Sequence, residues 1–119
     1  MQYMALIYVD ETAVEGASAE ERAAVTSRYF ALADDARAAG VMRGGEELAH
    51  TRDATTVRVR DGQTLVVDGP YAEAREVLGG FFLFECDSMD EAIEWAARIP
   101  AAERAGVEVR PVYADHSGA

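Results

Sequence analysis

The sequence VVDGPYAEAREVLGGFFLFE, residues 66–85, joins two strand-like runs through a turn and a short polar segment. The second run, Gly79 to Cys86, is apolar at consecutive positions, so both faces of the predicted strand are apolar. Such a strand is typical of a sheet that is covered on both sides. The first run ends in Asp68-Gly69-Pro70-Tyr71, whose residue types are typical of a tight turn. The same four residues could also hold a carboxylate rigidly at a strand end, where ligands often bind.

The residues before this stretch predict a β-hairpin. Val57 and Val59 alternate with arginines, and Asp61-Gly62 is a strong signal for a two-residue turn. Upstream of the hairpin, a weaker strand is expected from Val41 to Leu48, interrupted by Gly44-Gly45.

The two ends of the chain add strands and helices to this centre. Gln2 to Val9 predicts a strand that is apolar on both faces, and Val107 to Tyr113 predicts the last strand. Capping boxes at Ser18 and Ser88 predict two helices, ended near Gly40 and Pro100. The predicted apolar stripes are Val25, Tyr29, Leu32, Ala36 and Ala39 in the first helix, and Met89, Ala92, Ile93, Ala96 and Ile99 in the second.

The order of elements is β-α-β, hairpin, β-α-β. This order predicts a single domain over residues 1–113, a ferredoxin-like α+β sandwich (βαββαβ) with an extra β-hairpin, followed by a flexible tail over residues 114–119. Both helices can cover only one face of the sheet. The other face would carry Met4, Leu6 and Tyr8, with either Phe81 and Leu83 or Phe82 and Phe84. A bare apolar face of that size predicts a homodimer that packs sheet to sheet about a two-fold axis.

Composition excludes several classes of function. The net charge of −11 arises from 22 acidic residues and 11 arginines, which disfavours binding to nucleic acid or to an anionic membrane surface. The N-terminal sequence MQYMALIYVDE lacks the features of a signal peptide or a membrane span, so a cytoplasmic protein is expected. The single cysteine, Cys86, allows no internal disulfide and is expected to be a buried apolar group.

Candidate site residues come from the turn and from the strands. Asp68 and Tyr71 belong to the turn. Arg110 is expected to lie on the sheet face opposite the helices, where it would need a carboxylate or an anionic ligand if buried; it could equally be an edge arginine in solvent or part of an interface salt bridge. Tyr8 could hydrogen-bond a ligand or belong to the core, and Arg43 flanks the Gly44-Gly45 interruption, which could be only a bulge.

The segment Glu73–Glu76 could be a solvated loop with local ion pairs or a polar lid hinged at Gly79-Gly80. The two histidines, His50 and His116, are too far apart in sequence to predict a metal site. No phosphate-binding loop, nucleotide-binding fingerprint or nucleophile elbow occurs, so neither a metal nor a cofactor is expected.

The chain as a whole resembles the YCII-related family, in the branch named for its DGPF motif. The resemblance rests on MQYMALIYVDE, ARAAGVMRGGEEL, VEVRPV and the long run from TTVRVRDGQTLVVDGPYAEAREVLGGFF through WAARIP. Tyr71 stands where the branch name has Phe, which keeps the ring and adds a hydroxyl.

The resemblance implies a ferredoxin-like fold that forms a dimeric α+β barrel. It also implies a setting shared with extracytoplasmic-function sigma factors, because proteins of this branch are associated with them. Relatives in the wider family include a dehydrochlorinase-like enzyme and proteins with a proposed His-Asp pair. That pair does not transfer, because the acid position falls on Ile99 and the first predicted helix contains no histidine.

Two functions are therefore expected as alternatives, and whether the chain is an enzyme stays open. The first is a homodimer that binds or transforms a small anionic or aromatic metabolite, with a closed pocket near Asp68, Tyr71 and Arg110. In an enzyme, Asp68 would be the general base, Arg110 would bind an anion, and Tyr71 or Tyr8 would orient it. The second is a non-catalytic interaction module that acts on a sigma factor.

Overall fold

The structure of the protein is a computed structural model, of which residues 1–114 are described. The strands are β1 (Gln2–Asp10), β2 (Met42–Glu47), β3 (Thr55–Arg60), β4 (Gln63–Asp68), β5 (Glu76–Glu85) and β6 (Gly106–Pro111). The α-helices are α1 (Glu11–Gly16), α2 (Ala19–Ala38) and α3 (Met89–Ala97), and the 3-10 helices are η1 (Thr51–Asp53) and η2 (Pro100–Glu103).

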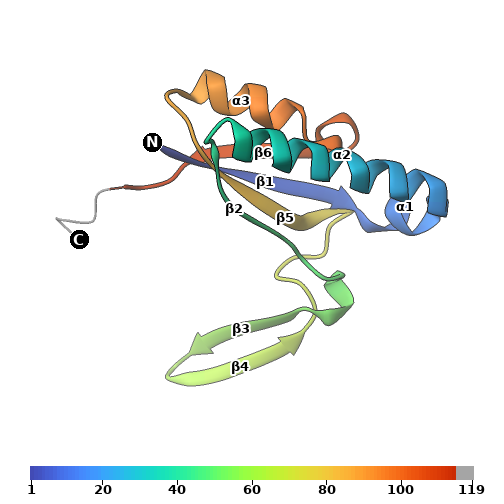
Figure 1. The fold of residues 1–119 in the computed structure, drawn as a ribbon. Coiled ribbons are helices and arrows are strands. Elements are labelled where there is room, and N and C mark those ends of the chain that lie inside the picture. Colours follow the sequence, from blue (N-terminus) through green and yellow to red (C-terminus); the bar gives the residue numbers. More distant parts are fainter. Residues whose placement is uncertain (115–119) are drawn as a thin grey trace.

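Four strands form the main sheet in the order β2-β5-β1-β6, with every neighbouring pair antiparallel. Helices α2 and α3 lie side by side on one face of this sheet, and the β3–β4 hairpin lies on the other side, away from the helices (Figure 1). The predicted α+β class, with antiparallel strands and two long helices on one sheet face, is confirmed.

The core lies between the sheet and the two long helices. Tyr3, Ala5 and Ile7 alternate along β1 and are buried, and β5 contributes Phe84, which is fully buried with Leu32 and Ile99. Tyr29, Phe82, Phe84 and Trp95 form a chain of neighbouring rings with centroids 5.7–6.3 Å apart. Phe82 and Phe84 therefore face the helices, which leaves Phe81 and Leu83 for the opposite face.

The capping signals of the sequence are confirmed. The Ser18 and Ser88 hydroxyls accept hydrogen bonds from the backbone N–H groups of Glu21 and Glu91. Gly40 follows α2 with φ +73°, a conformation that favours glycine. The predicted stripes are correct except for Ala39 and Ile93, which are exposed.

The β3–β4 hairpin forms where the sequence predicts it. Its turn, Asp61-Gly62, has φ values of +51° and +75°, which suit the right-handed twist of a two-residue hairpin. The hairpin pairs only with itself as a separate two-stranded sheet. It is described below as the arm (Thr55–Asp68).

Other predicted details need correction. Helix α1 was not expected, and its N-cap is Asp10, whose carboxylate accepts from the backbone N–H groups of Thr12 and Ala13. Strand β5 begins at Glu76 rather than Gly79, because a bulge after Ile7 lets Tyr8, Val9 and Asp10 continue to pair with it.

Gly79 and Gly80 are thus interior residues of β5. The prediction that they form the hinge of a lid over residues 73–76 is therefore wrong. Strand β6 ends at Pro111, although the N–H of Val112 still donates to the carbonyl of Gln2. The predicted tail falls mostly outside the described residues, as does His116.

Candidate functional site

The sheet face opposite the helices is apolar at its centre. Because side chains alternate along a strand, the residues between the buried positions of β1 and β5 point to this face. Its apolar members are Met4, Leu6, Tyr8, Leu78, Phe81 and Leu83, all partly or largely exposed. We call this surface, with Glu108 and Arg110 of β6, the open sheet face.

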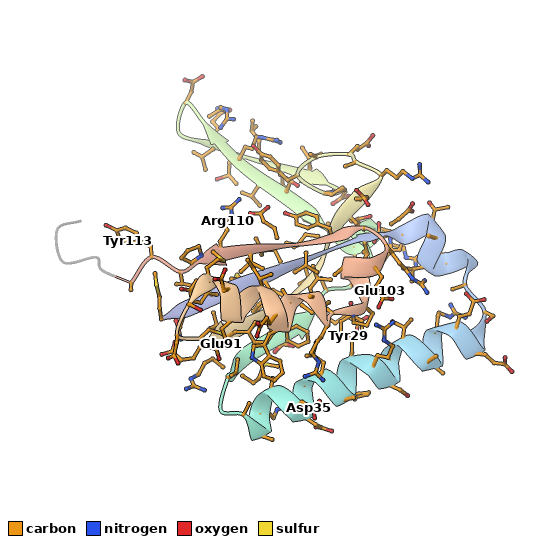
Figure 2. All side chains as sticks on the ribbon, turned by 90° about the horizontal axis from the view of Figure 1, so that it is seen from above. Tyr29, Asp35, Glu91, Glu103, Arg110 and Tyr113 are labelled. Atoms are coloured by element: carbon orange, nitrogen blue, oxygen red, sulfur yellow. The ribbon has the colours of Figure 1, made fainter. Side chains whose placement is uncertain are left out.

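Arg110 is the cation of this surface on β6. It pairs in the ladder with Met4, while Val107 and Val109 pack against the core, so its side chain lies on the side of β6 away from α3 (Figure 2). Its Nε donates to the Glu108 carboxylate two residues earlier on the same face, and its side chain is 70% exposed. The pair with Glu108 leaves the two terminal guanidinium nitrogens for a second carboxylate or an anionic ligand.

Tyr8 lies at one end of the open sheet face beside an open groove of about 490 Å³. The groove is lined by Tyr8, Glu76, Ala105, Gly106, Val107 and Glu108. Gly106, the ladder partner of Tyr8, carries no side chain that could cover the ring. The phenol is therefore available to a ligand in this groove, and Glu108 links the groove to Arg110.

Asp68-Gly69-Pro70-Tyr71 lies where the arm returns to the domain. Gly69 has φ +121°, and its N–H donates to the carbonyl of Ala54 at 2.8 Å. The Thr56 hydroxyl donates to the carbonyl of Gly69, also at 2.8 Å. Both bonds join Gly69 to the start of β3, so they extend the hairpin by one pair and fix the backbone next to Asp68. The chain bends at Gly69 and Tyr71, and neither bond closes a tight turn over residues 68–71.

The side chains of this segment are exposed. Tyr71 is 80% exposed, and the Arg58 guanidinium lies 5.1 Å from the centre of its ring, a cation–π contact. Asp68 is also exposed, at the end of β4. The loop after β4 thus covers part of the Arg58 side of the arm.

Arg43 lies at the opposite edge of the sheet, on β2. Its guanidinium donates to the carbonyls of Gly40 and Met42 at 2.8 and 3.2 Å, contacts that tie it to the bulge at the start of β2. It also lines a second groove of about 310 Å³ with Arg37, Met42, Gly44, Gly45 and Phe82.

The predicted site residues therefore form three groups within one chain. Tyr8 and Arg110 share the open sheet face, Asp68 and Tyr71 lie on the arm, and Arg43 lies at the far strand. Asp68, Tyr71 and Arg110 line neither of the two grooves described above. Neither groove is therefore the closed pocket that was predicted around these three residues.

A polar cluster at the base of the arm was missed by the sequence reasoning. The Glu11 carboxylate accepts from the N–H and the hydroxyl of Thr51 at 2.8 and 2.5 Å. His50 Nε2 lies 2.8 Å from Glu15, and His50 Nδ1 accepts from the N–H of Arg52. Burial raises the pKa of Glu11, but the hydrogen bonds from Thr51 outweigh it, so the pKa lies below its usual value.

The signal for this cluster was weak, because Glu11 and Thr51 lie 40 residues apart in the sequence. A neighbouring contact is of the same kind, since Arg75 donates to Asp10 at 3.0 Å and lowers the pKa of that carboxyl. Both contacts attach α1 and the end of β1 to the two segments that lead into and out of the arm.

Cys86 is buried, as expected, and burial raises the pKa of its thiol, which disfavours the reactive thiolate. Among residues 1–114, no group of three or more His, Cys, Asp or Glu side chains could hold a metal ion. None of the helices in the same range combines the length and apolar character that a membrane crossing requires.

Comparisons with known proteins give one consistent result. The sequence pattern described as the YCII-related domain matches residues 1–114. An uncharacterized protein of Rhizobium meliloti (strain 1021) is 37% identical over 114 residues, which cover 94% of this chain and 92% of the relative.

Proposed function

We propose that this chain, which belongs to the YCII-related family, is a homodimer that binds or transforms a small anionic or aromatic metabolite at its open sheet face. The observation that carries the proposal is an apolar sheet face that the helices leave uncovered and that bears an exposed arginine. An isolated soluble domain rarely leaves so large an apolar face in water unless it is used for binding.

The dimer would form by packing two open sheet faces about a two-fold axis. The strand order β2-β5-β1-β6, with a helical crossover in each half, suits a ferredoxin-like sheet of this kind. Two such sheets would close into a dimeric α+β barrel, and a cavity between them would be lined by Phe81, Leu83 and Tyr8.

The side chains of this face define the class of ligand. Aromatic and aliphatic groups would hold a flat apolar body, and the free guanidinium nitrogens of Arg110 would hold a carboxylate or phosphate. Tyr8 adds a hydroxyl at the groove next to Glu108. In an enzyme, Asp68 is the proposed general base, with Tyr71 or Tyr8 as the group that orients the substrate.

A thermal-shift screen of purified protein against a metabolite library tests this proposal. A ligand of the native state raises the melting temperature by mass action. We expect an anionic hit for the wild type that is lost in Arg110→Ala and kept in Arg104→Ala, a matched exposed arginine after η2. If the hit is turned over, Asp68→Asn should abolish turnover while the dimer persists.

Two outcomes of the screen would contradict the proposal. A hit that Arg110→Ala leaves unchanged contradicts the assignment of the anion site to the open sheet face. A well-folded dimer that no metabolite stabilises contradicts the proposal, and favours a non-catalytic module that binds a protein such as a sigma factor.

A further inference from the structure

The arm has an apolar surface that none of residues 1–114 covers. Val57, Val59 and Val66 are 60, 59 and 61% exposed, and they share one face because Val57 pairs with Val66 and Val59 pairs with Thr64. The other face carries Arg58, which stacks on Tyr71. An isolated two-stranded hairpin is marginally stable in water, so three bare valines on one side need a partner.

The segments at the base of the arm are attached to the rest of the domain. Its base is bonded through Gly69 to Ala54, and the neighbouring segments are held to β1 and α1 by the Asp10–Arg75 and Glu11–Thr51 contacts. Leu48 N–H also donates to the carbonyl of Gly79 at 2.9 Å. With its base attached in this way, the arm lies apart from the main sheet and its valines stay exposed.

The shape of the whole chain reflects this extension. Its radius of gyration is 16.5 Å, and it measures 48 × 48 × 18 Å. A compact domain of this length would have a radius of gyration of about 13–14 Å. The hairpin lies apart from the helix–sheet body on the side of the open sheet face (Figure 1). A second copy packed on that face would come within reach of the arm.

We propose that β3–β4 is an exchanged arm: its Val57, Val59 and Val66 face packs on a second copy of this chain and carries Asp68 to the open sheet face of that copy, beside Arg110. A second copy offers a matching apolar surface, and a two-fold axis covers both arms and both open faces at once. The inference rests on the homodimer of the proposed function and adds that each binding site is built from two chains.

Asp68 belongs to this contact because of the period of the strand. Asp68, Val66 and Thr64 alternate on one face of β4, so the surface that buries Val66 also presents the Asp68 carboxylate to the partner. On the open sheet face, Glu108 would repel this carboxylate, whereas one terminal nitrogen of Arg110 can receive it while the other stays available to an anionic ligand. Charge thus selects Arg110 as the partner of Asp68.

The first test is the oligomeric state, measured by sedimentation equilibrium. We expect a wild-type dimer, and we expect Val57→Asp and Val66→Asp to raise the dimer dissociation constant by at least tenfold, because each would bury an unpaired carboxylate. The matched control is Ile93→Asp, an exposed apolar residue on the helix layer that is 49% accessible and should leave the dimer intact. A monomeric wild type, or a Val66→Asp protein as dimeric as Ile93→Asp, overturns the inference.

The second test uses the absence of lysine from the sequence, whose 11 basic side chains other than histidine are all arginines. Arg110→Lys introduces one side-chain amine, which a zero-length carbodiimide reagent joins only to a carboxylate in contact with it. We expect a covalent dimer whose cross-linked peptides contain positions 110 and 68, and its loss when Asp68→Asn is added. Cross-links confined within one chain, or a covalent dimer unaffected by Asp68→Asn, overturn the composite site.

Neither readout requires a ligand. A screen without metabolite hits would therefore count against the proposed function and leave the arm exchange standing. If a metabolite binds but the Val57→Asp and Val66→Asp proteins remain dimeric, the proposed function is supported and the arm exchange is contradicted.

Discussion

At the scale of single residues, glycines let β5 pass close to its neighbours. A Cβ atom on Gly80 would lie 2.7 Å from the carbonyl oxygen of Glu46, a backbone atom that cannot move aside without shifting β2. A Cβ atom on Gly44 would lie 3.9 Å from the Leu83 Cβ, an ordinary contact. The two positions lie on adjacent strands of the same ladder, so they form a matched pair.

We therefore expect Gly80→Ala to lower the free energy of unfolding by about 1–3 kcal/mol, the usual cost of overpacking, and Gly44→Ala to change it by far less. Denaturant unfolding of both variants measures the difference. Equal stabilities would mean that β2 relaxes freely, and the register of the β2–β5 pair would then be less rigid than the ladder implies.

Residue types alone could place a change of chain direction but not its surroundings. The chain leaves β4 through bends at Gly69 and Tyr71, and Gly69 has the positive φ that its residue type allows. The contact of Glu11 with Thr51 could not be predicted, since it depends on how α1 and η1 meet in three dimensions.

At the scale of elements, the strands and long helices followed from periodicity and capping. Strand β5 is predicted from the sequence to be apolar on both faces. Alternation alone does not tell whether Phe82 and Phe84 or Phe81 and Leu83 point toward the helices. The ladder with β1 decides it, as Phe84 pairs with buried Tyr3 and Leu83 with Met4. Helix α1 was missed because a six-residue segment carries too little periodic signal.

The docking of α1 against η1 gives a prediction about pH. Glu11→Gln should lower the free energy of unfolding by about 1–2 kcal/mol at neutral pH, because it weakens two hydrogen bonds to a carboxylate. The folded pKa of Glu11 is lowered, so its stabilisation is present above the usual pKa of the unfolded chain and is lost as pH falls through the folded pKa.

The difference in the free energy of unfolding between wild type and Glu11→Gln should therefore decrease as the pH is lowered below the ordinary glutamate pKa of about 4.3. Denaturant unfolding at a series of pH values measures it, with Glu15→Gln, a more exposed carboxylate beside His50, as the control. A gap that does not depend on pH, or an equal effect of Glu15→Gln, would show that the Thr51 contacts do not depend on the charge of Glu11.

At the scale of the whole molecule, the sequence predicted that one sheet face would be bare but not that the hairpin would stand apart from it. Val57 and Val59 alternate with arginines as in any hairpin strand, and such a pattern does not say whether anything covers the valines, which are exposed. The position of the arm could not be predicted from one chain, because in our proposal its exposed face and the open sheet face are covered only by a second copy.

Association of two copies brings together two chains that each carry a net charge of −11. The proposed contacts are mainly apolar, and they work against the repulsion between two acidic chains. Raising the ionic strength from about 0.01 M to about 1 M shortens the screening length from about 30 Å to about 3 Å, which removes most of this repulsion. We therefore expect the dimer dissociation constant to fall several-fold as salt is added.

Sedimentation equilibrium at a series of sodium chloride concentrations measures this dependence. Arg110→Ala is the control, because it removes both symmetry-related copies of the proposed Asp68–Arg110 ion pair and should leave the direction of the salt effect unchanged. A dimer that weakens as salt is added would mean that ion pairs outweigh the apolar contacts. In that case the Val57, Val59 and Val66 face could not be the main source of the association energy.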